Sequence, residues 1–190
     1  MKRAGKRIRR ALPALLLALV LTVGISAAVC RVSLKTTEYT VAVRGLIAPL
    51  RTVVLSDLHS REYGKDNAAL LARVAQQQPD AIFCVGDFID SDAAPAQLQR
   101  LYQLLRRLGE IAPVFFSPGN HEIAYMESHG SELLDAVAAT GATVLYDRWV
   151  QTTLGGAVVR IGGSCGHFRD INRSAKLDYA MEETIGAAAP

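Results

Sequence analysis

The sequence predicts an α/β fold in which the strands of a parallel sheet alternate with helices. Three short apolar segments, residues 52–55, 81–85 and 113–116, have the length and composition of strands in such a sheet. The segments between them carry leucine, valine and alanine at helical spacing. This alternation is typical of βαβ units, and 190 residues are enough for one compact domain.

The first predicted helix begins after Asp66, whose carboxylate can cap the free N–H groups of the first turn. Pro79 marks the end of this helix, because proline does not continue one. The apolar residues at helical spacing are Leu70, Leu71, Val74 and Ala75. Ahead of the sheet, residues 39–43 are expected to form an edge strand.

The second predicted helix is capped by Ser91 or Asp92, carries Pro95 in its first turn and ends at Gly109. Its apolar stripe consists of Leu98, Leu101, Leu104, Leu105 and Leu108. A third helix is expected between Ser131, as its cap, and Gly141. Its apolar residues are Leu133, Leu134, Val137 and Ala138.

A β-hairpin is predicted after the third helix. Residues 149–154 and 157–161 have strand composition, and they flank the pair Gly155–Gly156. Two glycines between two such segments are typical of a tight hairpin turn.

The first thirty residues predict a membrane anchor. Residues 1–10 hold six basic side chains and no acid, and residues 11–29 carry no charge. An apolar stretch of about 20 residues is long enough to cross a bilayer as a helix. We therefore expect a cytoplasmic tail at 1–10, a single-pass anchor in the cell membrane at 11–30 and the main domain outside the cell. The alternative is a cleaved signal peptide, with small residues at 26–28 as its processing site.

Composition gives no support for nucleic-acid binding, a disulfide framework or a zinc knuckle. The formal net charge of +3 and the pI of about 8.9 come from the basic tail, and acids outnumber bases in the rest of the chain. We therefore predict no nucleic-acid-binding patch. Cys30, Cys84 and Cys165 are odd in number and lack paired spacing, so neither a disulfide framework nor a zinc knuckle is indicated.

Each of the three predicted strands is followed at once by a polar cluster. The clusters are Ser-Asp-Leu-His at 56–59, Gly-Asp-Phe-Ile-Asp at 86–90 and Ser-Pro-Gly-Asn-His-Glu at 117–122. They are about 30 residues apart, which is the length of one βαβ unit. Because the carboxyl ends of parallel strands meet at one edge of the sheet, the clusters are expected to converge there.

The residue types in the clusters predict a metal site. Asp57, His59, Asp87 and Asn120 offer carboxylate, imidazole and amide ligands, a mixture that suits Mn, Fe or Zn. A carboxylate that bridges two such ions permits two-metal displacement chemistry. The structural alternative is that Asp87 only caps the following helix. Asp90 is expected to be a helix cap or a supporting residue and not a ligand.

The third cluster is the most specific, because a generic turn needs Gly-Asn but not the His and Glu that follow. Together the clusters resemble the first three signature blocks of the calcineurin-like metallophosphoesterases, over residues 50–165. With the basic anchor before it, Ser-Asp-Leu-His-Ser at 56–60 is similar to the bacterial membrane-associated, YkuE-like branch. The resemblance implies the N-terminal part of an αββα sandwich, with a lead-in segment at 31–50 and a partial metallophosphoesterase domain at 51–190.

The resemblance also implies roles for the site residues. Asp57 and His59 would bind the first of two metal ions, Asp87 would bridge them and Asn120 would bind the second. His121 would be the catalytic imidazole, and a metal-bound hydroxide would attack the phosphoester. The supporting residues would be Asp90 and Glu122, the latter by orienting the loop of His121. The substrate would be a phosphoester, with phosphodiesters the expected class.

The chain departs from the family after Glu122. The later blocks of the family supply a single His and then a Gly-His-x-His pair. Here Gly166–Arg169 places Arg where the second His would stand, so His167 is not expected to be a ligand, and His129 is expected in an exposed loop. We therefore expect a truncated ligand set and little activity of this chain by itself.

Two alternatives stay open at this point. A degenerate paralogue would survive as a membrane-anchored binding or interaction protein, with no need for Asp57, Asp87 or Asn120. A second alternative keeps hydrolysis but makes the substrate a lipid-linked pyrophosphate, because the anchor would hold the site near lipid headgroups.

Overall fold

The computed structural model describes residues 13, 16–24, 26, 33–43, 45, 46 and 48–164. The chain divides into two compact units, Met1–Tyr39 and Thr40–Pro190. Residues 1–10, Cys30, Cys165 and His167, which the sequence analysis discusses, lie outside the described residues.

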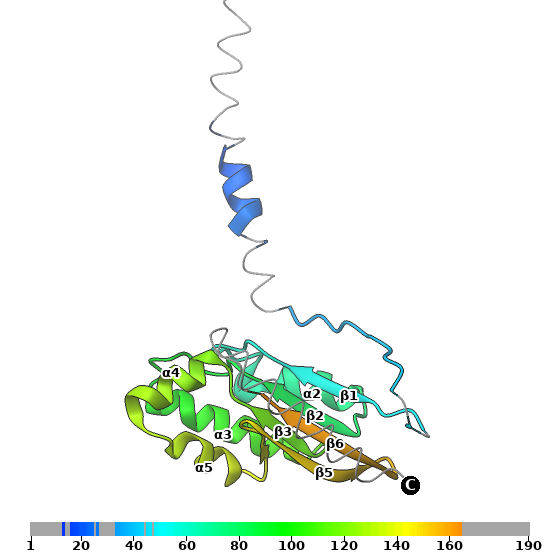
Figure 1. Ribbon diagram of the computed structural model, residues 1–190. Coiled ribbons are helices and arrows are strands. Elements are labelled where there is room, and N and C mark those ends of the chain that lie inside the picture. The colour runs from blue at the N-terminus through cyan, green and yellow to red at the C-terminus, as the bar shows by residue number, and fades with distance from the viewer. Residues whose placement is uncertain are drawn as a thin grey trace, which may run out of the picture. The chain divides into compact units, whose positions relative to one another are not determined.

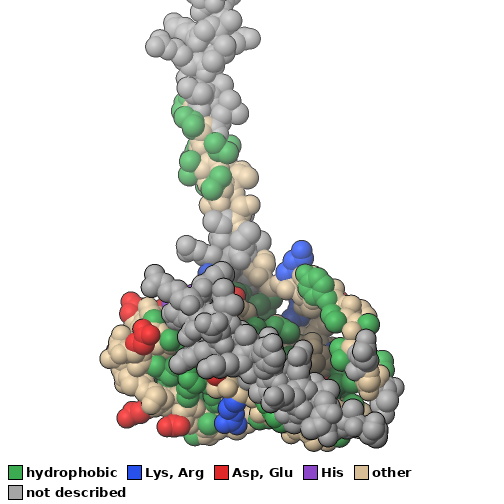
Figure 2. Space-filling view, in the orientation of Figure 1, with side chains coloured by type: hydrophobic (Ala, Val, Ile, Leu, Met, Phe, Trp, Pro, Cys, Tyr) green, Lys and Arg blue, Asp and Glu red, His purple; other side chains and the backbone are tan. Residues whose placement is uncertain are grey.

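In the first unit, the described residues at 16–24 are helical. Their leucine and valine side chains are more than half exposed. These side chains are drawn in green in Figure 2. Within the part of the chain that the structure describes, no helix reaches the length and apolar content that a membrane crossing requires. Residues 11, 12, 14, 15, 25 and 27–30 of the predicted anchor are not among those described.

The second unit is built on a four-stranded parallel sheet in the order β1-β2-β3-β4. The bounds are β1 Thr52–Leu55, β2 Ala81–Val85, β3 Val114–Ser117 and β4 Thr143–Val144. The helices between them are α2 Ala68–Gln76, α3 Pro95–Gly109, α4 Asn120–His129 and α5 Glu132–Ala138, and a short 3-10 turn, η1, spans Lys65–Asn67. The predicted α/β alternation is confirmed (Figure 1).

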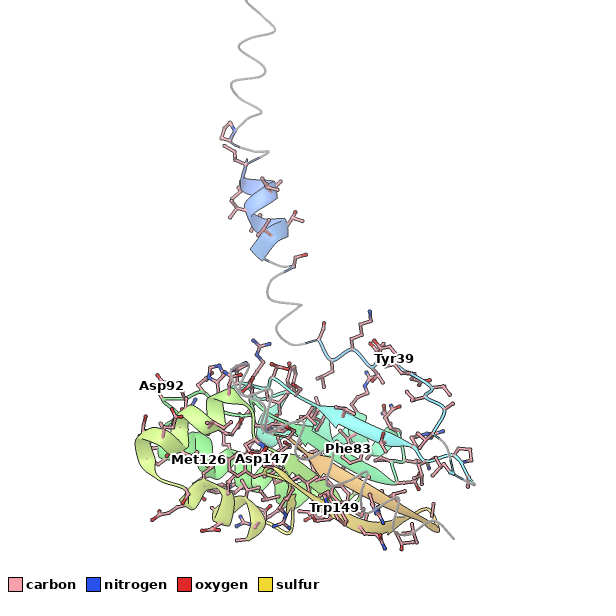
Figure 3. All side chains as sticks on the ribbon, viewed as in Figure 1. Tyr39, Phe83, Asp92, Met126, Asp147 and Trp149 are labelled. Atoms are coloured by element: carbon pink, nitrogen blue, oxygen red, sulfur yellow. The ribbon has the colours of Figure 1, made fainter. Side chains whose placement is uncertain are left out.

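The two faces of the sheet are packed differently. Ile82, Cys84 and Phe116 are fully buried on one face, and because side chains alternate along a strand, Phe83 and Phe115 lie on the other. On that second face the hairpin β5 Arg148–Leu154 and β6 Ala157–Gly163 packs against the sheet, as Figure 3 shows for the strands of Phe83 and Trp149. The residues of this inter-sheet core include Ala81, Phe115, Leu145, Leu154, Val159 and Ile161.

The hairpin turn is the one that two glycines favour. Gly155 has φ 52° and Gly156 has φ 82°, and both lie in the left-handed region that matches the twist of a two-residue hairpin. The predicted hairpin is therefore confirmed, with strands slightly longer than expected.

Several predictions about the elements are wrong. Residues 39–43 form no strand, and Asp66 does not cap α2 but lies within the 3-10 turn with φ 53°. The cap position of α3 is Ala94, whose N–H donates to Oε1 of Gln97 at 2.7 Å, so neither Ser91 nor Asp92 is needed there. Pro95 does begin α3, as predicted.

The first strand is not buried as predicted. It pairs only with β2 among the described strands, and Val54 is 59% exposed. The composition of an apolar run is the same whether the strand lies at the centre or at the edge of a sheet, so sequence alone does not separate the two cases.

Candidate metal centre

Three loops meet where β1, β2 and β3 end. The N–H of Asp57 donates to the carbonyl of Gly86 at 3.2 Å, and the N–H of His59 donates to the carbonyl of Asp87 at 2.9 Å. The loop after β1 therefore lies alongside the loop after β2, and the pairing of the two strands continues into the loops.

Two glycines allow the second and third loops to touch. A Cβ added to Gly86 would lie 2.6 Å from Cα of Gly119, closer than real Cβ atoms approach. A Cβ added to Gly119 would lie 2.7 Å from the backbone nitrogen of Asp87 and would also collide with its carboxylate. Glycine is therefore required at both positions by contact between backbones.

A buried carboxylate holds the same two loops together. Glu122 is fully buried, and its Oε1 accepts the N–H groups of Phe88 at 2.7 Å and Ile89 at 3.1 Å. Its Oε2 accepts the N–H groups of Asp87 and Gly119, both at 2.8 Å. Glu122 lies in the first turn of α4, so this one side chain fixes the start of α4 relative to the loop after β2.

The converging side chains include a set that fits a metal ion. Asp57, His59 and Asp87 each offer one ligand atom, and these atoms lie within 4.8 Å of one another. Two carboxylates and an imidazole suit a divalent transition metal. The side chain of Asp57 is 66% exposed, and Ser56 Oγ donates a hydrogen bond to its Oδ2, so the centre opens to solvent at this residue.

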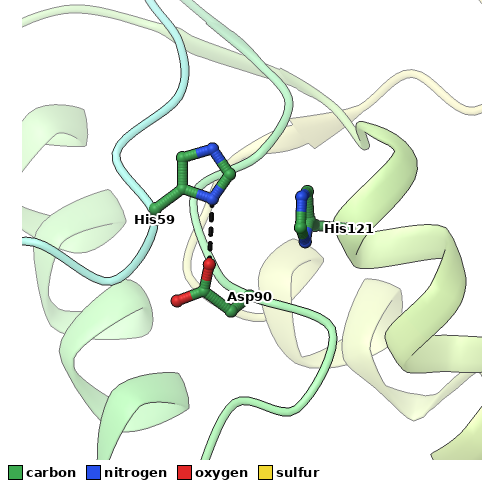
Figure 4. A group of neighbouring side chains, drawn as sticks. All are labelled: His59, Asp90 and His121. Atoms are coloured by element: carbon green, nitrogen blue, oxygen red, sulfur yellow. Dashed lines mark hydrogen bonds and ion pairs between the residues drawn. The ribbon is translucent and has the colours of Figure 1, made fainter.

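Asp90 orients the imidazole of His59. Nδ1 of His59 lies 2.9 Å from Oδ1 of Asp90 (Figure 4). A carboxylate accepts hydrogen bonds, so Nδ1 is the donor and Nε2 is left to face Asp57, 4.0 Å away. A carboxylate behind a ligating imidazole is a common arrangement at metal sites, because it fixes both the tautomer and the ring direction.

His121 lies across from His59. Their ring centroids are 4.8 Å apart with the planes perpendicular, and His121 also joins His59 and Asp90 in a second group of potential ligand atoms within 4.8 Å (Figure 4). Nδ1 of His121 is buried without a hydrogen-bond partner. The nitrogen of His121 that a substrate can reach is therefore Nε2.

Asn120 and His121 open helix α4 beside Asp87. The backbone N–H of His121 donates to Oδ1 of Asp87 at 3.0 Å, so this carboxylate lies at the positive end of the helix dipole. Asn120 is the first residue of the helix and is exposed. His129 lies at the last position of α4, and not in a loop as predicted.

The backbone is unusual at three of the four predicted ligands and at the neighbouring Ser60. Asp57, His59, Ser60 and Asp87 have φ of 57°, 47°, 57° and 56°, in the left-handed region that residues other than glycine seldom occupy. Such conformations persist only where the surrounding structure imposes them, and they gather at functional sites. The sequence does not predict these left-handed conformations, because aspartate and histidine are also common in ordinary loops.

Residues 50–181 match the family model of the calcineurin-like phosphoesterases. The chain belongs to this family. No curated protein matches it. Membership in the calcineurin-like phosphoesterases, together with the converging ligands, makes the chain a metal-dependent phosphoric ester hydrolase in general class. The family match extends past the last described residue, Ser164.

Proposed function

We propose that the protein hydrolyses phosphodiesters with the help of two divalent metal ions, Mn, Fe or Zn, bound at this centre. The observation that carries the proposal is the convergence of Asp57, His59 and Asp87 at the ends of adjacent parallel strands. Bound metal ions would polarise the phosphoryl group and lower the pKa of a water molecule. The exposed Asn120 at the start of α4 is proposed as a further ligand.

In this proposal the side chains of the protein orient the metal ligands and supply a proton. Asp90 holds His59 with Nε2 toward the other ligands. Asp87, braced by the N–H of His121, lies between the loop after β1 and the start of α4. The Nε2 of His121 is proposed to give a proton to the leaving oxygen, because its other ring nitrogen is buried.

We further propose that residues 11–30 anchor the protein in the cell membrane, with residues 1–10 in the cytoplasm and the phosphoesterase domain outside. Support comes from the six basic residues of the tail and the uncharged stretch that follows. Such an anchor also supports assignment to the membrane-associated, YkuE-like branch. Fractionation of cells and protease protection of a C-terminal tag would test this topology.

The hydrolysis is tested with the purified full chain, bis(p-nitrophenyl) phosphate and each of the three metals. We expect metal-dependent release of p-nitrophenol, and a loss of at least about 100-fold in the Asp87→Asn variant, because a ligand to both ions is weakened. Asp92→Asn is the matched control, since Asp92 is an exposed acid of the same loop outside both groups of potential ligands.

Metal content is measured on the same samples, so that a loss of activity can be distinguished from a loss of bound metal. Undiminished turnover in Asp87→Asn would overturn the assignment of Asp87. A wild-type chain that binds metal tightly but hydrolyses no diester would overturn the hydrolytic proposal and favour a binding protein. Hydrolysis that required lipid-linked substrates in vesicles, with no activity on the small diester, would contradict a general phosphodiesterase.

A further inference from the structure

Helix α4, which begins at the candidate metal centre, is only partly buried. Of its ten residues only Glu122 is fully buried, residues 121 and 123–126 are half-buried, and the other four are exposed. A helix that does not bury an apolar stripe gains little from the core. In Figure 1, α4 lies at one end of the second unit, beyond the sheet.

One face of α4 carries aromatic rings at regular spacing. His121, Tyr125 and His129 are four residues apart, and residues at this spacing share one side of a helix. Tyr125 is partly exposed and His129 is exposed. A row of rings therefore extends from the proposed proton donor along the helix.

Tyr125 and His129 form a stacked pair, which we call the aromatic platform. The two ring centroids are 4.3 Å apart and the planes differ by 11°. Nδ1 of His129 lies 3.1 Å from the carbonyl oxygen of Tyr125. A carbonyl only accepts hydrogen bonds, so Nδ1 is the donor and the imidazole is held in place behind Tyr125.

A residue of α3 lies close to the same tyrosine. Burial raises the pKa of Tyr102, and the neighbouring Tyr125 raises it further. Tyr102 is therefore near enough to Tyr125 for the two phenol groups to interact electrostatically. A surface aromatic ring that is already stacked on a neighbouring ring loses little conformational freedom when it binds a ligand.

We propose that the aromatic platform binds the leaving group of the substrate, and that it selects a flat, uncharged ring. The inference rests on the proposed phosphodiesterase function. Tyr125 lies one helical turn, about 6 Å, along α4 from His121, within reach of a group attached to the leaving oxygen. No Lys or Arg occurs between Asn120 and His129, and the exposed charge there is Glu127, which disfavours a leaving group with a further phosphate.

The test compares two diesters of equal charge, bis(p-nitrophenyl) phosphate and bis(2,2,2-trifluoroethyl) phosphate, with products followed by phosphorus NMR. In Tyr125→Leu we expect KM for the aryl diester to rise about tenfold, with kcat and the alkyl diester unchanged within about twofold. Tyr125→Phe keeps the ring and should behave as wild type. Met126→Leu, a volume-conserving change at the next position of α4, is the matched control.

A binding measurement needs no turnover. Calorimetry with phenylphosphonate and methylphosphonate should show weaker binding of the phenyl compound alone in Tyr125→Leu, and a smaller loss in His129→Ala, which removes the backing ring. Equal losses for aryl and alkyl ligands, or none for either, would overturn the platform. If the wild type hydrolyses neither diester, the proposed function fails; if it hydrolyses both and the variant treats them alike, the platform alone fails.

Discussion

A buried carboxylate costs several kcal/mol unless polar partners replace its water, and Glu122 is fully buried. Its partners are four backbone N–H groups from two loops. Hydrogen bonds to a charged acceptor are about twice as strong as neutral ones. The single side chain therefore balances its own desolvation and sets the distance between Asp87 and the start of α4.

Replacement of Glu122 by glutamine tests this role. The amide nitrogen of glutamine cannot accept a hydrogen bond, so two backbone donors lose their partner in a buried place. We expect the free energy of unfolding to fall by about 3 kcal/mol and metal affinity to fall with it. Urea unfolding measures the first effect. Glu127→Gln, on the exposed side of the same helix, should change neither quantity, and an equal effect there would contradict the assignment.

The hydrogen bond from His59 to Asp90 makes a separate prediction. In Asp90→Ala the imidazole loses its orienting partner, and Mn²⁺ affinity should fall about 10- to 100-fold. Asp90→Glu is expected to recover part of the loss. Titration calorimetry would compare the Mn²⁺ affinity of these two variants with that of Asp92→Ala. A similar loss of affinity in Asp92→Ala would show a general effect of charge and contradict the role of Asp90.

The thiol of Cys84 predicts a pH dependence of stability. Burial raises its pKa, so the folded protein keeps the thiol protonated at a pH where the unfolded chain has lost the proton. Unfolding then releases a proton, and stability should fall by about 1 kcal/mol as the pH rises from 7.5 to 9.5. Cys84→Val removes this contribution. The prediction fails if wild type and variant lose the same unfolding free energy over that range.

At the scale of elements, the contact of two loops depends on Gly119. Its φ of −92° is open to any residue, so the requirement for glycine there is steric and not conformational. Gly119→Ala should displace Asp87, lower stability by about 1–3 kcal/mol and weaken metal binding. Gly109→Ala is the matched control, because its added Cβ meets nothing within 4 Å. Melting curves with and without Mn²⁺ would show both effects.

The elements also show what sequence could and could not predict. The strands before the three clusters were found because apolar runs are local signals, and the rule that parallel strands end at one edge brought Asp57 and Asp87 together. Helix α4 was missed because it buries only Glu122 and so has no apolar periodicity. The start of α2 was misplaced because Asp66 and Asn67 both adopt left-handed conformations, which propensity does not predict.

At the scale of the whole molecule, the metal centre joins three strand ends that the sheet already holds side by side. Ions bound there would connect loops that are far apart in sequence. A ligand that binds only the folded state stabilises it by about 2.7 kcal/mol at 100 times its Kd. Saturating Mn²⁺ should therefore raise the melting temperature by several degrees. The shift should disappear in Asp87→Asn and persist in Asp92→Asn.

The sequence predicts the order of strands and helices better than it predicts which of the strands are buried. The α/β alternation and the hairpin follow from local patterns, whereas the edge position of β1 depends on which strands pair across the whole sheet. The inter-sheet core could not be foreseen either, because the local pattern that predicts the hairpin does not show that it packs on the face of the sheet that carries Phe115.

The left-handed backbone at Asp57, His59 and Asp87 sets stability against function. A residue with a side chain in this region costs about 1–2 kcal/mol relative to glycine, which adopts it freely. Glycine at any of these positions would relax the fold while it deleted a proposed ligand. A library of this protein sorted only for heat resistance should therefore accumulate glycine at 57, 59 and 87, and its most robust members would be its least competent hydrolases.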